Sequence, residues 1–445
     1  MSCAASTTAI NTCLPSFATS STRPRRALLK PSHRHGRAAS RVIGVSQMTW
    51  QQRKERRMTC AVQTGIDVLR DNHFADLRGR RVGLLTHRAA VSSDGHTTLD
   101  LLLNADGVEV VAVFTPEHGY GAQMDAAVPS IIDSETGLPF HSLYGASRRP
   151  TAEQLAGIDL LLFDLQDVGA RFYTYITTMG HTMEEAARLG IPCIVLDRPN
   201  VITGTKLEGP IMDPTLKSFV GYFQFPIRHG MTVGEVARWH AIQEKLDVDL
   251  RVVSMVGWVR TMWFDDTGLP WTPPSPAMRS PTTATLYPGI CCLERSNVSV
   301  GRGTDHPFEW VGAPWVDENS LAGILEERQI PGVSFRAIDF SPAASLYADE
   351  LCHGIAIEVT DRELLNSVQL GFQVLDAIHR QNPVELDFGN CIPLLGDAAS
   401  VSALQSFIPV DEIFDTWEND LGTFSEARKE ALLYADRVRL GAVEE

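Results

Sequence analysis

The chain lacks the features that define several large classes of protein. Its 445 residues contain no apolar stretch near the ~20 residues that a membrane-spanning helix needs. The eight cysteines include no Cys-x-x-Cys spacing, which argues against both a zinc site and a disulfide framework. We therefore expect buried free thiols in a reducing compartment and no integral membrane segment.

Motifs of common nucleotide and hydrolase sites are also missing. No GxxxxGK[ST] loop occurs, and no GxGxxG follows the first expected strand, so the sequence does not indicate a nucleotide cofactor. Neither the GxSxG of esterases nor the HExxH of metalloproteases is present. We expect no cofactor and no metal, although a metal site made of His118, Asp164 and Asp167 stays open as an alternative.

Acidic residues are almost absent from the first 60 residues. This part holds eleven Lys and Arg and one acid, Glu55, a balance of +10. Since the whole chain has a net charge of −15, the remainder carries −25, which disfavours nucleic acid and anionic membranes as partners.

The same leader is rich in Ser, Thr, Ala and Arg and has no apolar core of the kind that a secretory signal needs, as is typical of organellar transit peptides. We expect residues 1–62 to be a transit peptide or disordered leader, with a plastid favoured over a mitochondrion. A true start at Met48 or Met58 would instead indicate a cytoplasmic protein.

From about residue 65 the sequence alternates short apolar runs with helical patterns. The expected strands are 81–86, 108–115, 158–163, 191–196 and 250–255. The expected helices are 97–104 and three that open at capping-box sequences, at Thr151, Thr182 and Thr232. This alternation predicts an α/β fold with a Rossmann-like parallel sheet.

A proline-rich segment, 265–290, interrupts this rhythm. Because proline fits neither a helix interior nor a central strand, we expect a connector between domains that also lines the site. Beyond it, strand-like 333–340 and 354–360 and an amphipathic helix over 362–380 predict a smaller α+β domain. The expected domains are therefore a catalytic domain over 63–285 and a C-terminal domain over 286–445.

Three of the expected strands end on acidic residues. The first of them leads to Glu117, the second to Asp164 and Asp167, and the third to Asp197. In open α/β sheets ligands bind outside the carboxyl ends of the strands, so these acids would gather on one rim. Paired carboxylates there would perform acid–base chemistry, which predicts an enzyme. For Asp197, a turn braced by an ion pair with its neighbour Arg198 is the better explanation.

Side chains near these acids suit a sugar ligand. Glu117 and His118 lie between a proline and a glycine, which can hold them at a defined angle. The loop after Asp164 contains Arg171 and Tyr173, which can hydrogen-bond hydroxyl groups and stack on a sugar ring. For Asp164 and for Asp167, a structural ion pair with an arginine is an equally good interpretation.

Four further residues are candidates for substrate binding. Arg302 lies between two glycines, which would let the backbone approach a ligand while it presents one guanidinium. His229 directly precedes the capping box at Thr232, whose Glu235 is explained by that box. The other two candidates are Asn200 and Asp305.

Taken in order, the longer motifs resemble the NamZ family of exo-acting β-N-acetylmuramidases. The resemblance runs from about Gly65 to Tyr434 and rests on PEHG (116–119), TGLPFHSLYG (136–145), FDLQDVGARFYTY (163–175), VLDRPN (195–200), HGMTVGE (229–235), PSP (274–276), SVGRGTDHPFE (299–309) and GAPW (312–315). Several long motifs in one order make this resemblance specific.

The resemblance implies a Rossmann-like N-terminal domain, a smaller barrel-like C-terminal domain and an active site in the cleft between them. It also implies release of N-acetylmuramic acid from non-reducing ends of peptidoglycan glycans. Glu117 is then the expected catalytic carboxylate, assisted by His118 and by Asp164 or Asp167. Arg302 would be the counter-charge for the lactyl carboxylate of muramic acid.

The chain departs from the family's motifs at some positions. Ala277 stands where Asn is usual, and Val300 stands where many members have Glu. These departures leave a catalytically silent sugar-binding protein as one alternative. A metal-dependent hydrolase is the other.

Overall fold

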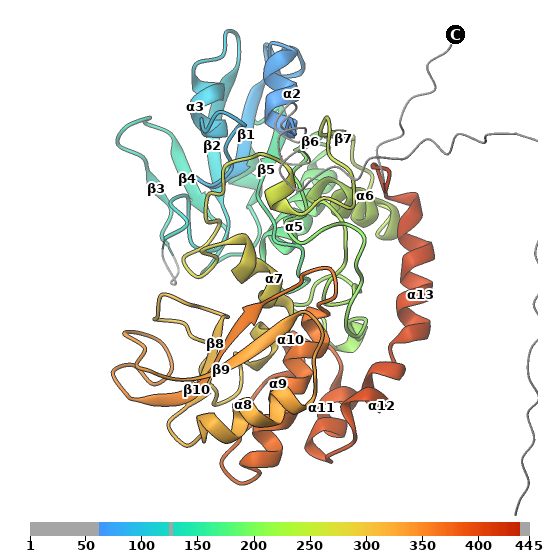
Figure 1. Cartoon of the computed structure of the whole chain (residues 1–445). Helices are drawn as coiled ribbons and strands as arrows, with labels where there is room; N and C mark the ends of the chain where they lie inside the picture. The colour runs from blue at the N-terminus through green and yellow to red at the C-terminus, as the bar shows by residue number, and fades with distance from the viewer. Residues whose placement is uncertain (1–61, 124–127, 437–445) are drawn as a thin grey trace, which may run out of the picture. The chain divides into compact units, whose positions relative to one another are not determined.

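The computed structural model describes residues 62–123 and 128–436, which belong to one compact unit (Figure 1). All of the leader expected over 1–62 except its last residue lies outside the described residues. Within the described part, no helix is both long and apolar enough to cross a membrane.

The larger sheet has seven strands and is parallel except at one edge. Its order is β3-β4-β2-β1-β5-β6-β7, and only β3 pairs antiparallel with its neighbour. The strands are β1 (Arg81–Thr86), β2 (Glu109–Thr115), β3 (Ile131–Ile132), β4 (Pro139–Ser142), β5 (Leu160–Asp164), β6 (Cys193–Leu196) and β7 (Leu250–Val253). The prediction of an α/β fold with a parallel sheet is confirmed.

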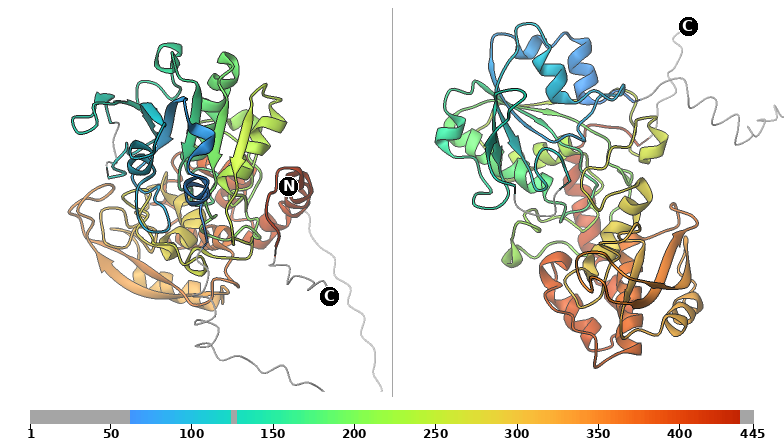
Figure 2. Two further views of the ribbon diagram at one scale, coloured as in Figure 1. Left: turned by 90° about the horizontal axis from the view of Figure 1, so that it is seen from above. Right: turned by 90° about the vertical axis from the view of Figure 1, so that its left-hand side faces the viewer.

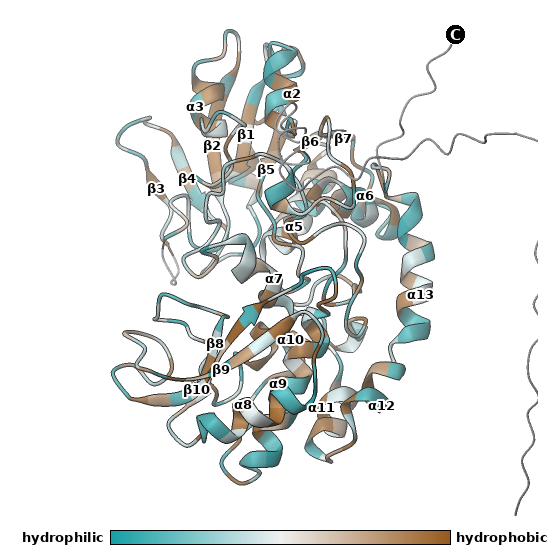
Figure 3. Ribbon diagram, viewed as in Figure 1, coloured by the Kyte–Doolittle hydropathy of each residue, from teal (hydrophilic) through white to brown (hydrophobic). Residues whose placement is uncertain are grey.

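Helices cover both faces of this sheet, because the central strands are apolar on both sides. In β5, Leu161 and Phe163 join one apolar cluster while Leu160 and Leu162 join another. The first cluster includes residues of α5 and α6, and the second includes residues of α2 and α3 (Figures 2 and 3). The helices of this part are α2 (Gly65–Asp71), α3 (Thr98–Leu103), α4 (Ala152–Leu155), α5 (Tyr175–Leu189) and α6 (Val233–Gln243).

One helix begins earlier than its capping box predicted. Thr182 lies inside α5, where its hydroxyl donates to the carbonyl of Thr178 at 2.8 Å instead of capping a helix. The capping boxes at Thr151 and Thr232 are confirmed, since both side chains accept from the expected backbone amides. A Thr-x-x-Glu sequence can therefore occur within a helix as well as at its start.

The smaller sheet has three antiparallel strands in the order β8-β10-β9. They are β8 (Trp310–Ala313), β9 (Val333–Phe340) and β10 (Cys352–Val359). Helix α8 (Glu318–Glu327) packs against β9 and β10, and α9 (Ser367–Gln381) packs against α8. The α+β prediction for this part is confirmed. The sheet is open, with β8 and β9 as its edges, rather than closed into a barrel.

The proline-rich segment ends in a helix, which the sequence analysis excluded. α7 (Pro281–Ile290) begins with proline at its first position, where no amide partner is needed, and Ser280 caps it. Pro288 lies in the last turn, so it costs only one hydrogen bond of a short helix. Packing supplies the compensation: Gly289 of α7 and Gly371 of α9 let the two backbones touch.

The C-terminal segment returns to the larger sheet. After α10 (Ile392–Leu395), α11 (Ala398–Gln405) and α12 (Val410–Asp415), helix α13 (Glu418–Ala427) leads back toward α6 (Figure 1). Arg428 then donates to the carbonyl of Gly230 at 2.7 Å, and the Tyr434 hydroxyl donates to Asp197 at 2.6 Å. The last described residues thus complete the hydrogen bonding of the first sheet's loops.

The cysteines of the described residues are buried free thiols, as expected. They are Cys193, Cys291, Cys292, Cys352 and Cys391. Cys3, Cys13 and Cys60 lie outside the described residues.

Candidate active site

A cavity of about 610 Å³ lies where loops of the larger sheet meet the segment after α7. Its walls carry two carboxylates, several aromatic rings and two guanidinium groups. The lining residues are Glu117, His118, Phe172, Tyr173, Thr174, Ser275, Pro276, Ala277, Met278, Arg279, Tyr287, Glu294, Arg302, Gly303, Thr304, Pro307, Phe308, Ala344 and Ser345. Four of the ten residues predicted from the sequence are among them: Glu117, His118, Tyr173 and Arg302.

Glu117 is held at this cavity by two hydroxyl groups. The Thr174 hydroxyl donates to its Oε2 at 2.6 Å. A hydrogen bond to Glu117 also raises the pKa of Tyr144 to about 12, so Tyr144 stays a neutral phenol beside the carboxylate. The turn itself is tight, since His118 has a φ of 70° and Gly119 one of 67°. The turn at His118 and Gly119 therefore sets the direction of the Glu117 side chain, and the hydroxyl groups of Thr174 and Tyr144 hold its carboxylate.

A second carboxylate in the cavity is one that the sequence analysis missed. Glu294 follows α7 and lies 2.5 Å from the Nε of Arg302. The Cys291 thiol donates to its other oxygen at 3.2 Å. Glu294 follows a helical segment and not a strand, so its position gives no strand-end signal in the sequence.

Aromatic rings line the same cavity as the two carboxylates. Tyr287 makes edge-to-face contacts with Phe172, at 5.2 Å between ring centroids, and with Phe308, at 4.8 Å. Tyr173 lies 6.0 Å from the same ring, and its burial raises its pKa, so it remains un-ionised. The Arg302 guanidinium is 5.1 Å from the centre of the Phe308 ring. Such a wall suits the apolar face of a sugar.

Asp164 is not a cavity residue, because it is the last residue of β5 and is fully buried. Both of its oxygens pair with the guanidinium of Arg198, one of them at 2.8 Å, and the hydroxyl of Thr98 also donates to it. The prediction of a catalytic role conflicts with this placement. The alternative of a structural ion pair is the correct one, with Arg198 as the partner.

Asp167 and His229 form a buried pair beneath the cavity rather than in it. The Oδ2 of Asp167 accepts from the amide of Gly169 at 2.7 Å and lies 3.8 Å from the Nε2 of His229. Burial raises the pKa of Asp167 to about 7, and burial with nearby arginines lowers that of His229 to about 3. Neither side chain lines the cavity, so the structure does not support the predicted direct contact with substrate.

Arg171 and Asn200 have structural partners instead of a ligand. The guanidinium of Arg171 is fully buried and donates to four backbone carbonyls, those of Pro210, Phe225, Leu394 and Leu395. Asn200 donates to the carbonyl of Met231 at 2.9 Å and accepts from the amide of Ile202. Neither side chain lines the cavity, so the structure does not support their predicted contacts with substrate.

The last predicted residue, Asp305, lies outside the cavity. Its exposed carboxylate pairs with Arg279 at 2.7 Å, and Arg279 is the partner that lines the cavity. Asp197 is buried, which agrees with the expected scaffold role, but the expected ion pair with Arg198 is wrong, because the guanidinium of Arg198 pairs with Asp164. Asp197 instead accepts from the hydroxyl of Thr232 and the amide of Gly234, each at 2.8 Å.

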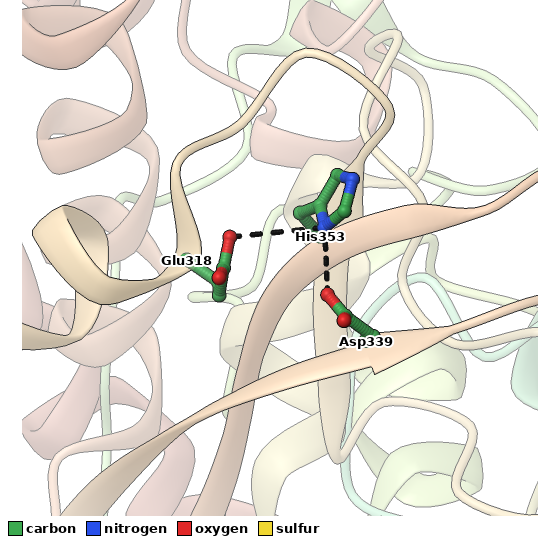
Figure 4. A group of neighbouring side chains, drawn as sticks. All are labelled: Glu318, Asp339 and His353. Atoms are coloured by element: carbon green, nitrogen blue, oxygen red, sulfur yellow. Dashed lines mark hydrogen bonds and ion pairs between the residues drawn. The ribbon is translucent and has the colours of Figure 1, made fainter.

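Among the described residues, one group of side chains has the composition of a metal site. Glu318, Asp339 and His353 offer ligand atoms within 4.8 Å of one another (Figure 4). His353 faces Asp339 across the β9–β10 pair, and its Nδ1 is 2.6 Å from the carboxylate. This group lies on the smaller sheet and none of its members lines the cavity. Of the alternative metal set His118, Asp164 and Asp167, only His118 reaches the cavity.

Comparison with protein families decides the relationship. The model described as "Exo-beta-N-acetylmuramidase NamZ, N-terminal" matches residues 82–282, and the corresponding C-terminal model matches residues 285–434. The chain belongs to the NamZ family. Both the family and the glycosidase class expected from the sequence are thereby confirmed.

A curated NamZ protein and two solved structures are similar over most of the chain. The peptidoglycan β-N-acetylmuramidase NamZ of Bacillus subtilis (strain 168) is 42% identical over 378 residues, which are 84% of this chain and 91% of that protein. Two DUF1343 family proteins of Bacteroides fragilis NCTC 9343 have TM-scores of 0.78 and 0.70, at 35% and 30% identity. Each comparison covers 84% of this chain and 99% of the other.

The boundary between the two NamZ matches lies inside α7, and residues of both matches line the cavity. The PEHG motif contributes from the N-terminal match and the Gly-Arg-Gly segment from the C-terminal match. Of the long motif over 163–175, only the part from Phe172 to Thr174 lines the cavity, while its aspartates and Arg171 lie in the interior. The NamZ motifs thus combine residues of the cavity with residues that hold its loops.

Proposed function

We propose that this protein is an exo-acting glycosidase that releases N-acetylmuramic acid from non-reducing ends of peptidoglycan glycans. One observation carries the proposal: in a chain of the NamZ family, two carboxylates, Glu117 and Glu294, line one cavity with an aromatic wall. Glycoside hydrolysis commonly uses a pair of carboxyl groups on the two sides of the scissile bond. The activity of the Bacillus subtilis relative supports the choice of substrate.

In the proposed mechanism Glu117 protonates the leaving oxygen. Its carboxyl group is oriented by the hydroxyl groups of Thr174 and Tyr144, and positioning of this kind lowers the entropic part of the barrier. Glu294 replaces the aspartates of the sequence prediction as the second carboxylate. It pairs with the guanidinium of Arg302, and as a carboxylate it can activate water or stabilise an oxocarbenium ion.

Arg302 has a second role in the proposal, which is to bind the substrate. A guanidinium has five donors in a planar fork, and Glu294 engages the Nε side of this one. We assign the lactyl carboxylate of muramic acid to the same guanidinium. The substrate then carries its own charge into the cavity beside the second catalytic carboxylate and is bound in one orientation.

The test is hydrolysis of a chromogenic aryl N-acetylmuramide by purified variants. Glu117→Gln and Glu294→Gln keep the size of each side chain and should each lower kcat by about 10²–10⁴-fold, the range for a lost acid–base group. Glu327→Gln, at an exposed position of α8, is the matched control and should retain full activity. Near-normal turnover by Glu117→Gln would refute the assignment.

The departure at Ala277 motivates one alternative function. This residue lines the cavity where the family's motif usually has an amide side chain, which fits a sugar-binding protein that has lost turnover. Binding of N-acetylmuramic acid by the wild-type protein without hydrolysis of the aryl glycoside would favour that alternative. Restored turnover in Ala277→Asn would identify the missing group.

We also propose that the basic leader directs the protein to an organelle, a plastid before a mitochondrion. The near absence of acids in residues 1–60 supports this proposal. N-terminal sequencing of the protein isolated from its source tests it. A mature chain that starts near residue 62 is expected, and an intact Met1 would contradict it.

A further inference from the structure

A second cavity, of about 600 Å³, adjoins the first. Both are lined by Ser275, Pro276 and Arg279, so the proline-rich segment forms a wall common to the two. Its size lies within the ~300–1,000 Å³ that is usual for sites of small ligands. None of the residues to which the proposed mechanism gives a role lines this second cavity.

The second cavity is built beside the Glu117 turn. Arg88 lies two residues beyond the end of β1, and its backbone amide donates to the carbonyl of Tyr120 at 2.7 Å. Gly121 and Ala122 follow the same turn and line the cavity, and Thr97, the cap of α3, lies opposite. The second cavity therefore begins next to the carboxylate that we assign to the leaving oxygen.

Its wall includes guanidinium groups that can bind an anion. The ionisable side chains that line it are the guanidinium groups of Arg88 and Arg279 and one carboxylate, that of Asp100. Arg88 and Arg279 are both exposed, so a ligand can reach them. Arg279 is paired with Asp305 at 2.7 Å, which makes Arg88 the better candidate for a charge on the ligand.

We propose that the second cavity binds the leaving-group side of the glycan and that Arg88 pairs with a carboxylate of it. The inference rests on the proposed function. When a terminal muramic acid fills the first cavity, the bond to be cleaved faces Glu117, and the rest of the glycan has to continue past that side chain. The adjoining cavity is the space that the described residues offer there. In a glycan that alternates N-acetylmuramic acid with N-acetylglucosamine, the next muramic acid beyond the cleaved bond supplies the carboxylate.

The test compares two substrates that differ in the leaving group. The leaving group of an aryl N-acetylmuramide has no carboxylate, whereas a tetrasaccharide of alternating N-acetylmuramic acid and N-acetylglucosamine, with muramic acid at its non-reducing end, has one on its leaving-group side. Arg88→Ala should lower kcat/KM for the tetrasaccharide about 10-fold, the value of one exposed charge-assisted hydrogen bond. It should leave kcat/KM for the aryl glycoside within about 2-fold, because the aryl group offers Arg88 no carboxylate and Arg88 does not line the first cavity.

Two controls separate charge from structure. Arg336→Ala removes an exposed arginine of β9 that lines neither cavity and should change neither substrate. A tetrasaccharide whose carboxylates are converted to amides should be cleaved equally by the wild type and by Arg88→Ala. A merely structural role of Arg88 would not produce that equality.

The outcomes are distinct for the two proposals. An equal loss on both substrates, or no loss on either, would overturn the role of the second cavity while the glycosidase assignment stands. If the wild-type protein hydrolyses neither substrate, the proposed function itself fails.

Discussion

Replacing Arg171 by alanine should destabilise the protein without removing a contact to substrate. The guanidinium is fully buried and donates to four carbonyls at 2.7–3.0 Å, two of them at the end of α10. A hydrogen bond to a charged group contributes about 1.5–3 kcal/mol, but four from one group are not additive. Burial also disfavours the charge and lowers the pKa of Arg171 to about 10.

We therefore expect Arg171→Ala to lower the free energy of unfolding by about 4 kcal/mol, because it leaves four buried carbonyls without their donor. That is a large share of the ~5–15 kcal/mol that stabilises a typical protein. Arg171→Lys should lie between the two, because an ammonium has three donors and no planar fork.

The assay is urea unfolding followed by tryptophan fluorescence, combined with kinetics on the aryl N-acetylmuramide. For Arg171→Ala the unfolding midpoint should fall while KM of the folded fraction is kept. Arg302→Ala, which changes a cavity residue, is the matched comparison and should raise KM with a smaller loss of stability. An unchanged midpoint with a raised KM for Arg171→Ala would restore Arg171 as a substrate ligand and refute the reasoning.

Three further predictions concern the support of the site and the core. Thr174→Val removes a donor to Glu117, so kcat should fall about 10-fold with little change in KM, as steady-state kinetics would show. His87 is buried, and burial together with Arg198 and His118 lowers its pKa to about 3. Its unfolded form gains a proton below about pH 6.5 while the folded form does not, so stability is present above that pH and is lost as the pH falls toward 3. Between pH 7 and pH 5 the wild type should lose about 2 kcal/mol more than His87→Gln in urea unfolding, and equal losses would contradict the prediction. Gly371→Ala should lower the thermal midpoint although alanine favours helices, because its Cβ would lie 2.3 Å from the carbonyl oxygen of Gly289; an unchanged midpoint would show that α7 can move away.

The sequence predicted β1, β2, β5, β6 and β7 of the larger sheet because each lies in a short apolar run. It did not predict β3 and β4, which are two and four residues long and mostly not buried. It could not tell which acids face the cavity. Asp164 is still part of β5 and is enclosed by helices on both faces, whereas Glu117 lies two residues beyond β2 and has left the sheet layer. Distance from the strand end does not decide this alone, since Asp167 lies three residues beyond β5 and is buried outside the cavity.

The remaining errors have a common physical cause, which is contact between segments far apart in the chain. Arg171 resembles a sugar ligand until the carbonyls of α10 are placed around it, more than 220 residues later. α7 is excluded by its prolines until Gly371 allows it to pack closely against α9. Glu294 was not predicted because it follows a helix, whereas the candidate acids were those that follow strands.

The return of the chain's end to the larger sheet has a consequence for synthesis. Asp197, the loop at Gly230 and the carboxylate of Glu235 obtain partners from Tyr434, Arg428 and the amide of Leu433. A ribosome releases these partners after the first 285 residues, so until then Asp197, Glu235 and the carbonyl of Gly230 have only the hydrogen bonds made within the first part of the chain. The boundary between the two family matches is therefore a poor place to cut the gene for expression. Either half alone would lack groups that the other half supplies.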